Sequence, residues 1–368
     1  MMASLSRVLA VLMKEFIQMR RDRLTFAMMI GIPLVQLLLF GYAINTDPRH
    51  LPTLVELGDD GPAVRAIIQG METSAYFDIQ GMIAPGETDD ALRTNETTFI
   101  LVVPPNFERD LLRGEQPDIL LDVDASDPVA AGAGAGAFPQ IVASATAEYG
   151  SGAAAAATPV IHRRYNPAGE TAMNIVPGLL GIILTMTMAM MTSMALTKEA
   201  ERGTLETLLA TPTRPLEVMA GKIAPYVLVG AMQVILMLLA ARYLFGVPFL
   251  GGAGAFIIAV ALFILVNLSL GFLFSTLART QMQAMQMTFF VFLPSILLSG
   301  FMFPFAGMPG WARFLGEMIP TTHFIRAVRS IMLKGADMAD VWPSLWPLMI
   351  TFAVIATLAL TRYRRTLD

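Results

Sequence analysis

The chain has 368 residues, of which 55% are hydrophobic and only 15% are charged, and its mean hydropathy is +0.60. Soluble domains carry about 25% charged residues, so this composition excludes an ordinary cytosolic enzyme. The net charge of −4 averages two unlike parts, because residues 45–172 hold 7 basic and 19 acidic side chains, whereas the remainder holds 18 basic and 10 acidic. We therefore expect a membrane body with one acidic, water-soluble insert, which no disulfide stabilises because cysteine is absent.

The first 23 residues carry apolar side chains at helical spacing, and a charged cluster at 20–23 ends the stripe. This pattern predicts a cytoplasmic amphipathic helix over 1–23 that lies on the inner leaflet. A basic topology anchor with no further role is the alternative. The uncharged run 24–46 follows, and it is long enough for a first transmembrane helix. Its full length and charged flank argue against a cleaved signal peptide.

The insert, residues 47–171, changes from helical to mixed periodicity. Alternating strands and helices predict a small extracytoplasmic α/β domain with its own core. The expected strands are Leu51–Leu57, 98–103 and 119–123, and the expected helices are Pro62–Thr73, 87–95, 105–113 and the alanine-rich 128–157.

No catalytic group of residues stands out in the insert. Asp122, Asp124 and Asp127 resemble a loose calcium loop but lack the glycine and terminal glutamate that such a loop needs. A solvated turn after a strand is the expected role. His50 and His162 have no partner at a metal-ligand spacing, so no metal site is predicted.

Five further uncharged runs lie in 172–368 and bring the expected total to six transmembrane helices. They are 171–197, 223–241, 255–278, 280–298 and 341–361. Between the last two, Gly300 and Pro304 break the apolar pattern, and we expect the chain to turn back into the membrane in a re-entrant outer region over 299–340. The predicted fold class is a polytopic α-helical membrane protein with an inserted extracytoplasmic α/β domain.

Basic residues near the span ends orient the chain. With the N-terminus inside, the inner segments hold 13 basic residues and the short outer loops hold five. Because basic loops stay cytoplasmic, both termini are expected in the cytoplasm and the insert outside.

The cytoplasmic loop 198–222 is the most informative segment. A short charged helix begins near Lys198 and stops at Thr211 and Pro212. Such a helix at the inner membrane face suits docking of a cytosolic protein, and an ordinary amphipathic loop is the equal alternative.

This loop resembles the inner-loop signature of ABC-2 type transporter permeases. The matching sequence is KEAERGTLETLLATP, followed by GK before the next span; Ala200 departs from the charged residue usual in close relatives. Similar stretches cover most of the chain, among them FLPSILLSGFMFPFAGMPGW and IPTTHFIRAVRSIMLKGA. A large external domain after the first span is typical of the bacterial drug-efflux subclass.

The resemblance implies the permease subunit of an ATP-driven exporter of amphipathic or lipophilic compounds in the bacterial inner membrane. It implies that 1–23 is a connecting helix, that 198–212 is a coupling helix seated in an ATPase subunit, and that Ser299–Phe305 and the Trp311 stretch form half-helices of an outer gate. The residues expected to couple to the ATPase are Glu199, Glu201, Arg202, Gly203, Thr204, Glu206, Thr211, Pro212, Gly221 and Lys222.

The implied partners are ABC ATPase subunits, a second permease copy or similar paralogue, the lipid bilayer and a periplasmic adaptor, but no nucleic acid. The sequence contains no phosphate loop, because Leu216 stands where the first glycine before Gly221–Lys222 belongs. We therefore expect no enzyme activity and no cofactor in this chain, with ATP and Mg²⁺ bound by the partner ATPase.

The pathway is expected to be lined by uncharged polar and soft apolar groups. The candidates are Asn174, Gln233, Asn267, Gln286, Pro294, Ser299, Gly300, Phe301 and Phe303. An ion-coupled secondary transporter is the first alternative, disfavoured because no acid or histidine lies deep in a span. A membrane-anchored adaptor or sensor without transport is the second.

Overall fold

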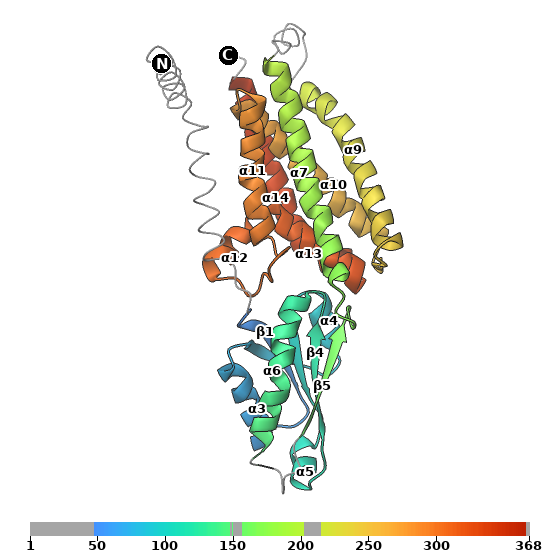
Figure 1. Ribbon diagram of the computed structural model, residues 1–368, viewed down its shortest axis with the longest axis vertical. Coiled ribbons are helices and arrows are strands. Elements are labelled where there is room, and N and C mark those ends of the chain that lie inside the picture. Colours follow the sequence, from blue (N-terminus) through green and yellow to red (C-terminus); the bar gives the residue numbers. More distant parts are fainter. Residues whose placement is uncertain (1–47, 148, 150–156, 202–214, 366–368) are drawn as a thin grey trace, which may run out of the picture.

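The computed structural model describes residues 48–147, 149, 157–201 and 215–365. A helical bundle and an α/β domain are stacked along the long axis of the molecule (Figure 1). The predicted helix over 1–23 and the predicted first span over 24–46 lie outside the described residues. So does most of the coupling loop, from 202 to 214.

The α/β domain is built on a five-stranded sheet with the strand order β2-β1-β3-β4-β5. Strand β1 runs parallel to both β2 and β3, whereas β4 is antiparallel to β3 and parallel to β5. The strands are β1 (Leu51–Leu57), β2 (Phe77–Ile83), β3 (Phe99–Val103), β4 (Asp118–Asp124) and β5 (Thr158–Arg164).

Helices cover both faces of this sheet because its central strands are apolar on both sides. On one face, α3 (Pro62–Thr73) and α6 (Pro128–Thr146) pack together over a core that includes Phe99 and Phe138. On the other face, α4 (Thr88–Arg93) covers Leu54 and Ile100. The short α5 (Phe107–Leu112) lies at the end far from the bundle (Figure 1).

The three predicted strands and the four predicted helices of this domain are confirmed, although the last helix ends at Thr146 rather than at 157. Strands β2 and β5 were missed. Both are edge strands with only one paired neighbour, and their side chains alternate between partly covered and exposed. A glycine in β2, and a proline and a run of basic residues in β5, weaken the apolar pattern by which strands are recognised.

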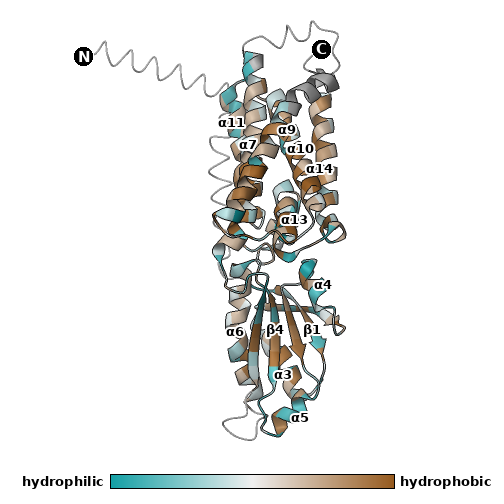
Figure 2. Cartoon of the chain, turned by 90° about the vertical axis from the view of Figure 1, so that its right-hand side faces the viewer, coloured by the Kyte–Doolittle hydropathy of each residue, from teal (hydrophilic) through white to brown (hydrophobic). Residues whose placement is uncertain are grey.

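Among the residues that the structure describes, five helices of the bundle are long and apolar enough to cross a membrane. A helix is present at each of five predicted spans, and the apolar part of each begins and ends within a few residues of the predicted bounds. Helix α10 is the most buried of them and packs along both α7 and α14, and apolar residues colour most of the bundle (Figure 2). The five are α7 (Thr171–Glu201), α9 (Pro215–Tyr243), α10 (Ala253–Leu277), α11 (Gln281–Leu298) and α14 (Met338–Arg365).

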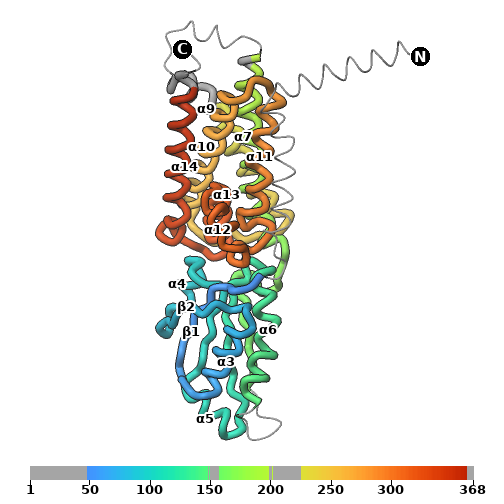
Figure 3. Tube along the Cα trace, turned by 90° about the vertical axis from the view of Figure 1, so that its left-hand side faces the viewer, coloured from blue at the N-terminus to red at the C-terminus, as the bar shows by residue number. Residues whose placement is uncertain are grey.

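The chain between α11 and α14 closes the end of the bundle that faces the domain (Figure 3). It comprises an irregular turn segment (residues 299–309), the short helix α12 (Gly310–Glu317) and α13 (Pro320–Lys334). Helix α13 is almost fully buried against α7, α10 and α14.

The expectation of a half-helix over Ser299–Phe305 is wrong. Gly300 adopts φ +77°, a left-handed conformation that ends the helix at α11, and Pro304 supplies no backbone N–H for a new turn. The expected half-helix around Trp311 is present as α12.

Small residues allow the helices of the bundle to approach closely. A Cβ on Gly271 of α10 would lie 2.5 Å from the carbonyl oxygen of Ala189 on α7. A Cβ on Gly178 of α7 would lie 2.5 Å from the ring of Phe301 in the turn segment. Backbone contact at α10 and ring contact at the turn segment therefore both depend on the missing methyl group.

Gly271→Ala is expected to separate α7 from α10 and to lower the free energy of unfolding by about 1–3 kcal/mol, as overpacking does. Gly254→Ala is the matched control in the same helix, because no atom lies within 4 Å of its Cβ position. Thermal unfolding in detergent should show a lower midpoint for Gly271→Ala alone. Equal midpoints for the two variants would contradict the close α7–α10 contact.

Candidate functional site

The end of α7 that carries predicted coupling residues is bonded to the start of α11. The carboxylate of Glu201 accepts hydrogen bonds from the backbone N–H of Gln281 at 2.8 Å and from its Nε2 at 2.5 Å. Thr280 caps α11 by accepting from the backbone N–H of Gln283. These two hydrogen bonds link the last residue of α7 directly to the first residue of α11.

The remaining predicted coupling residues are only partly placed. Glu199 lies in the last turn of α7, and Gly221 and Lys222 lie in the first half of α9. Arg202, Gly203, Thr204, Glu206, Thr211 and Pro212 lie outside the described residues.

The structure does not gather the predicted polar pathway residues into one site. Gln233 of α9 accepts a hydrogen bond from Thr187 of α7, and Asn267 donates to a carbonyl of its own helix. The side-chain oxygens of Asn174 and Gln286 are buried without a partner. Gln233 and Asn267 therefore serve helix packing in the conformation seen here.

The predicted gate residues hold the turn segment closed by packing. Phe301 packs with Phe292 and Ile325, whereas Phe303 packs in a second cluster around Leu298. Pro294 lies within α11, which continues through it.

A buried cation joins the domain to the bundle. Lys334, the last residue of α13, has a fully buried side chain, and its ammonium forms an ion pair with Asp124 of β4. The same ammonium donates to the carbonyl oxygen of Leu92 at 2.9 Å and to Oδ1 of Asn95 at 2.6 Å. Asn95 in turn donates to Ser330 at 2.7 Å. We call these five residues the joint.

The partners of the Lys334 ammonium compensate for the cost of burying its charge between the domain and the bundle. A buried ammonium is stable only when it is paired and fully hydrogen-bonded, and Lys334 has three oxygen partners. Its Nζ also lies 5.3 Å from the ring centroid of Tyr165, a cation–π distance. Burial, together with the charge of Asp124, raises the pKa of Tyr165 to about 12, so the phenol stays neutral beside it.

The expectation that Asp122, Asp124 and Asp127 form a solvated turn is wrong for the first two. Asp122 is 1% exposed and bonds Nε of Arg164 at 2.6 Å on the missed strand β5. Burial raises the pKa of Asp122, and the nearby His162 opposes this. Asp127 caps the N-terminus of α6. The described residues contain no group of acids and histidines able to hold a metal ion.

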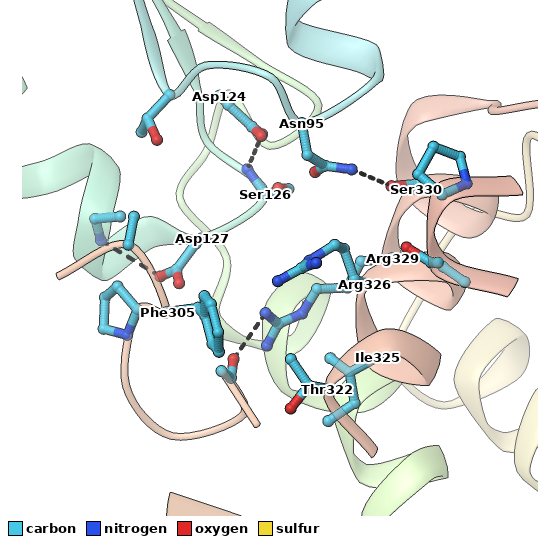
Figure 4. Close-up of a pocket in the computed structure, with 18 of the residues that line it drawn as sticks. Asn95, Asp124, Ser126, Asp127, Phe305, Thr322, Ile325, Arg326, Arg329 and Ser330 are labelled. Atoms are coloured by element: carbon cyan, nitrogen blue, oxygen red, sulfur yellow. Dashed lines mark hydrogen bonds between the residues drawn. The ribbon is translucent and has the colours of Figure 1, made fainter. Parts of the chain in front are cut away.

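A cavity of about 610 Å³ lies beside the joint, between the domain and the closed end of the bundle. Figure 4 shows Asp127 on its domain side and the guanidinium groups of Arg326 and Arg329 on the opposite side. Of the predicted gate residues, Ser299 and Gly300 line it.

The two arginines bind the turn segment to the bundle. Arg326 pairs with Glu317 at 2.9 Å and lies over the ring of Phe305, 5.1 Å from its centroid. Arg329 donates to the carbonyl oxygens of Gly300 at 2.9 Å and of Asn174 at 3.5 Å. These hydrogen bonds join α13 to the turn segment and to the first part of α7.

Comparison with known proteins agrees with this architecture. The sequence profile described as "ABC-2 family transporter protein" matches residues 23–361. The chain belongs to the ABC-2 family of transporter proteins. It is therefore an ABC transporter permease of the ABC-2 type and a polytopic helical membrane protein.

Several relatives come from Escherichia coli strain K12. The probable multidrug ABC transporter permease YbhR is 28% identical over 98% of both chains. The inner membrane transport permease YhhJ is 34% identical over 78% of both chains, and the probable multidrug ABC transporter permease YbhS is 31% identical over 89% of both.

Lys334→Met is expected to destabilise the docked domain by about 3–5 kcal/mol, because it leaves a buried carboxylate and two other acceptors unpaired. Denaturant unfolding of the purified chain measures the loss. The double variant Lys334→Met/Asp124→Asn should recover part of it, since a neutral amide is less costly to bury than a lone carboxylate. Wild-type stability of the single variant would contradict the role given to the joint.

Proposed function

We propose that this chain is the permease subunit of an exporter that separate ATPase subunits drive by binding ATP and Mg²⁺. Family membership carries the proposal. The sequence contains no phosphate loop of its own, which supports an external motor.

The proposed topology has six spans, with 24–46 as the first, both termini in the cytoplasm and the α/β domain outside. The excess of basic residues in the segments assigned inside supports it. The domain lies at the end of α7 that begins with Thr171 (Figure 1), and Glu201 is the last residue at the opposite end of that helix. That separation suits a motor on one side of the membrane and a substrate exit on the other.

In the proposed mechanism, α7 carries a displacement from its cytoplasmic end to its outer end. Its 31 residues span about 46 Å at roughly 1.5 Å per residue. ATPase closure displaces the 198–212 segment, and the bond between Glu201 and Gln281 passes this displacement to α11 as well as α7. At the far end, Gly178 of α7 lies against Phe301 and Gly181 against Phe324 of α13. A tilt of α7 therefore repacks the turn segment and opens the outer end.

The proposed substrates are amphipathic or lipophilic compounds, and the permease works as a dimer with a second copy or a similar paralogue. Support comes from the apolar character of the bundle and from the names of two relatives, which are called probable multidrug permeases. The external domain is proposed to guide substrate or to dock a periplasmic adaptor.

Reconstitution with the ATPase tests the coupling. Glu206→Lys is expected to reduce ATP-driven export at least tenfold, because charge reversal on the coupling helix opposes docking. The matched control Glu206→Gln should lose much less. Export is measured as uptake of a fluorescent lipophilic cation into inside-out proteoliposomes. ATPase activity in the purified permease alone, or full export in Glu206→Lys, would contradict the assignment, as would uptake driven by an ion gradient without ATPase.

Gly300→Ala tests the turn segment as part of the gate. Alanine at φ +77° is strained by about 1–2 kcal/mol, and we expect export to fall at least fivefold because the bond to Arg329 shifts. Gly246→Ala is the matched control, since Gly246 has φ +66° and no atom within 4 Å of its Cβ position. Equal export in both variants would contradict a gate role for the turn segment, whereas no ATP-driven export by the wild type would favour an adaptor or sensor over a transporter.

A further inference from the structure

The cavity beside the joint is lined by charged side chains, some of which form no ion pair. The lining carboxylates of Asp124, Glu317 and Asp340 each pair with a basic side chain. Within the part of the chain that the structure describes, Arg329 has no carboxylate at ion-pair distance, and Asp127 has no basic partner at that distance. Arg313 also lines the cavity but is exposed to solvent. Arg329, whose Nε is buried, and Asp127 are therefore the cation and the carboxylate on which the site would depend.

Arg329 lines this space and has a donor that no acceptor satisfies. Two of its nitrogens reach backbone carbonyl oxygens, whereas its Nε is buried and has no partner. Ser299, a residue 3% exposed, also lines the cavity, and its hydroxyl is buried without a partner. Buried donors without acceptors are rare in folded proteins, and a planar guanidinium beside a hydroxyl suits the oxygens of a phosphate or carboxylate.

Asp127 supplies the opposite charge. Its Oδ1 accepts hydrogen bonds from the backbone N–H groups of Val129 and Ala130 at the start of α6. Burial raises the pKa of Asp127, and the guanidinium of Arg329 is the largest group acting against this. Asp127 and Arg329 therefore interact electrostatically without forming an ion pair. Figure 4 shows the two side chains on opposite sides of the cavity.

We propose that this cavity binds a zwitterionic head group in which a phosphate or carboxylate stands close to a primary ammonium. The anionic oxygens take the donors of Arg329 and Ser299, and the ammonium takes the carboxylate of Asp127. A volume of about 610 Å³ falls within the range of roughly 300–1,000 Å³ typical of small-molecule sites.

Exposed apolar side chains at the rim of the cavity could contact an alkyl chain attached to the bound head group. Phe314 of α12 lines the cavity and is 69% exposed, so it stands at the mouth. Trp311 of the same short helix and Met318, which directly follows it, are also exposed. An alkyl chain leaving the cavity past Phe314 would lie along this apolar surface. The same head-group chemistry occurs in membrane lipids and in free small zwitterions, and the experiment separates the two.

The site goes beyond the proposed export, because binding requires neither an ATPase nor movement of the helices. Titration of the purified full chain in detergent therefore tests it independently of transport. The probes are dihexanoyl phosphatidylethanolamine, free O-phosphoethanolamine and dihexanoyl phosphatidylglycerol, which carries a phosphate without an ammonium. Isothermal titration calorimetry measures each dissociation constant.

We expect saturable binding of the ethanolamine lipid, at least tenfold tighter than that of the glycerol lipid. Asp127→Asn should remove most of this tenfold preference while the glycerol lipid binds unchanged, because asparagine keeps the helix cap. Arg329→Gln should weaken both lipids at least tenfold. Arg65 is an exposed arginine of the α/β domain that does not line the cavity, and the control variant Arg65→Gln should bind both lipids as the wild type does.

Binding of free O-phosphoethanolamine as tightly as the lipid would identify a soluble zwitterion as the ligand class, and weaker binding would identify a lipid. Absence of saturable binding for both zwitterions would overturn the proposal. Equal affinity of wild type and Asp127→Asn for the ethanolamine lipid would also overturn it, and this comparison decides alone if Arg329→Gln does not purify as a folded protein.

Discussion

The burial of one lysine ammonium determines how the two halves of this permease are joined. Lys334 ends α13, and its side chain is enclosed by groups of the α/β domain. Taking such a charge out of water is favourable only while every partner stays in place. We therefore expect the contacts between the domain and α13 to be lost cooperatively, all together rather than one after another. A second ion pair, between Arg93 and Asp340 at 3.4 Å, extends the same contact to α14.

This constraint assigns different mechanical roles to the helices. The domain and α13 form one unit, whereas α7 contacts that unit by close packing at Gly178 and Gly181 and by two hydrogen bonds, from Arg329 to the carbonyl oxygen of Asn174 and between the hydroxyls of Thr185 and Thr321. In each of these hydrogen bonds at least one partner is neutral, so they cost less to break than the buried ion pair of the joint. A displacement of α7 at Glu201 is thus expected to change the packing between α7 and the turn segment, while the contact between the domain and α13 stays unchanged. The cavity with Arg329 and Asp127 lies at this boundary between fixed and movable parts.

Most of the fold was predictable because its elements have strong local patterns. Uncharged runs of sufficient length identified five of the helices, and Pro62–Thr73 was predicted to the residue. Strands β2 and β5 were missed because edge strands are held by pairing with distant neighbours rather than by their own apolar content. Helix α13 was assigned to a re-entrant region without recognition as a helix, although Pro320 at its start and Gly335 after its end were available signals.

The site was less predictable than the fold. The bond between Asp124 and Lys334 joins residues 210 positions apart, and nothing local in either segment indicates a buried pair. Because α13 was taken as loop, its cations were counted as evidence for orientation rather than as possible partners. Asp122 and Asp124 were assigned to solvent for the same reason, since a carboxylate is normally exposed unless a partner is known.

The account depends most on the rigidity of the joint, and pulsed electron spin resonance measures it directly. The chain has no cysteine, so spin labels can be attached at Met82→Cys in the domain and Met338→Cys in α14, both of which are exposed in the wild type. A single narrow distance distribution, unchanged when ATPase, ATP and vanadate are added, is the result expected for a domain locked to the bundle. A broad distribution, or one that shifts on nucleotide trapping, would contradict the locked joint.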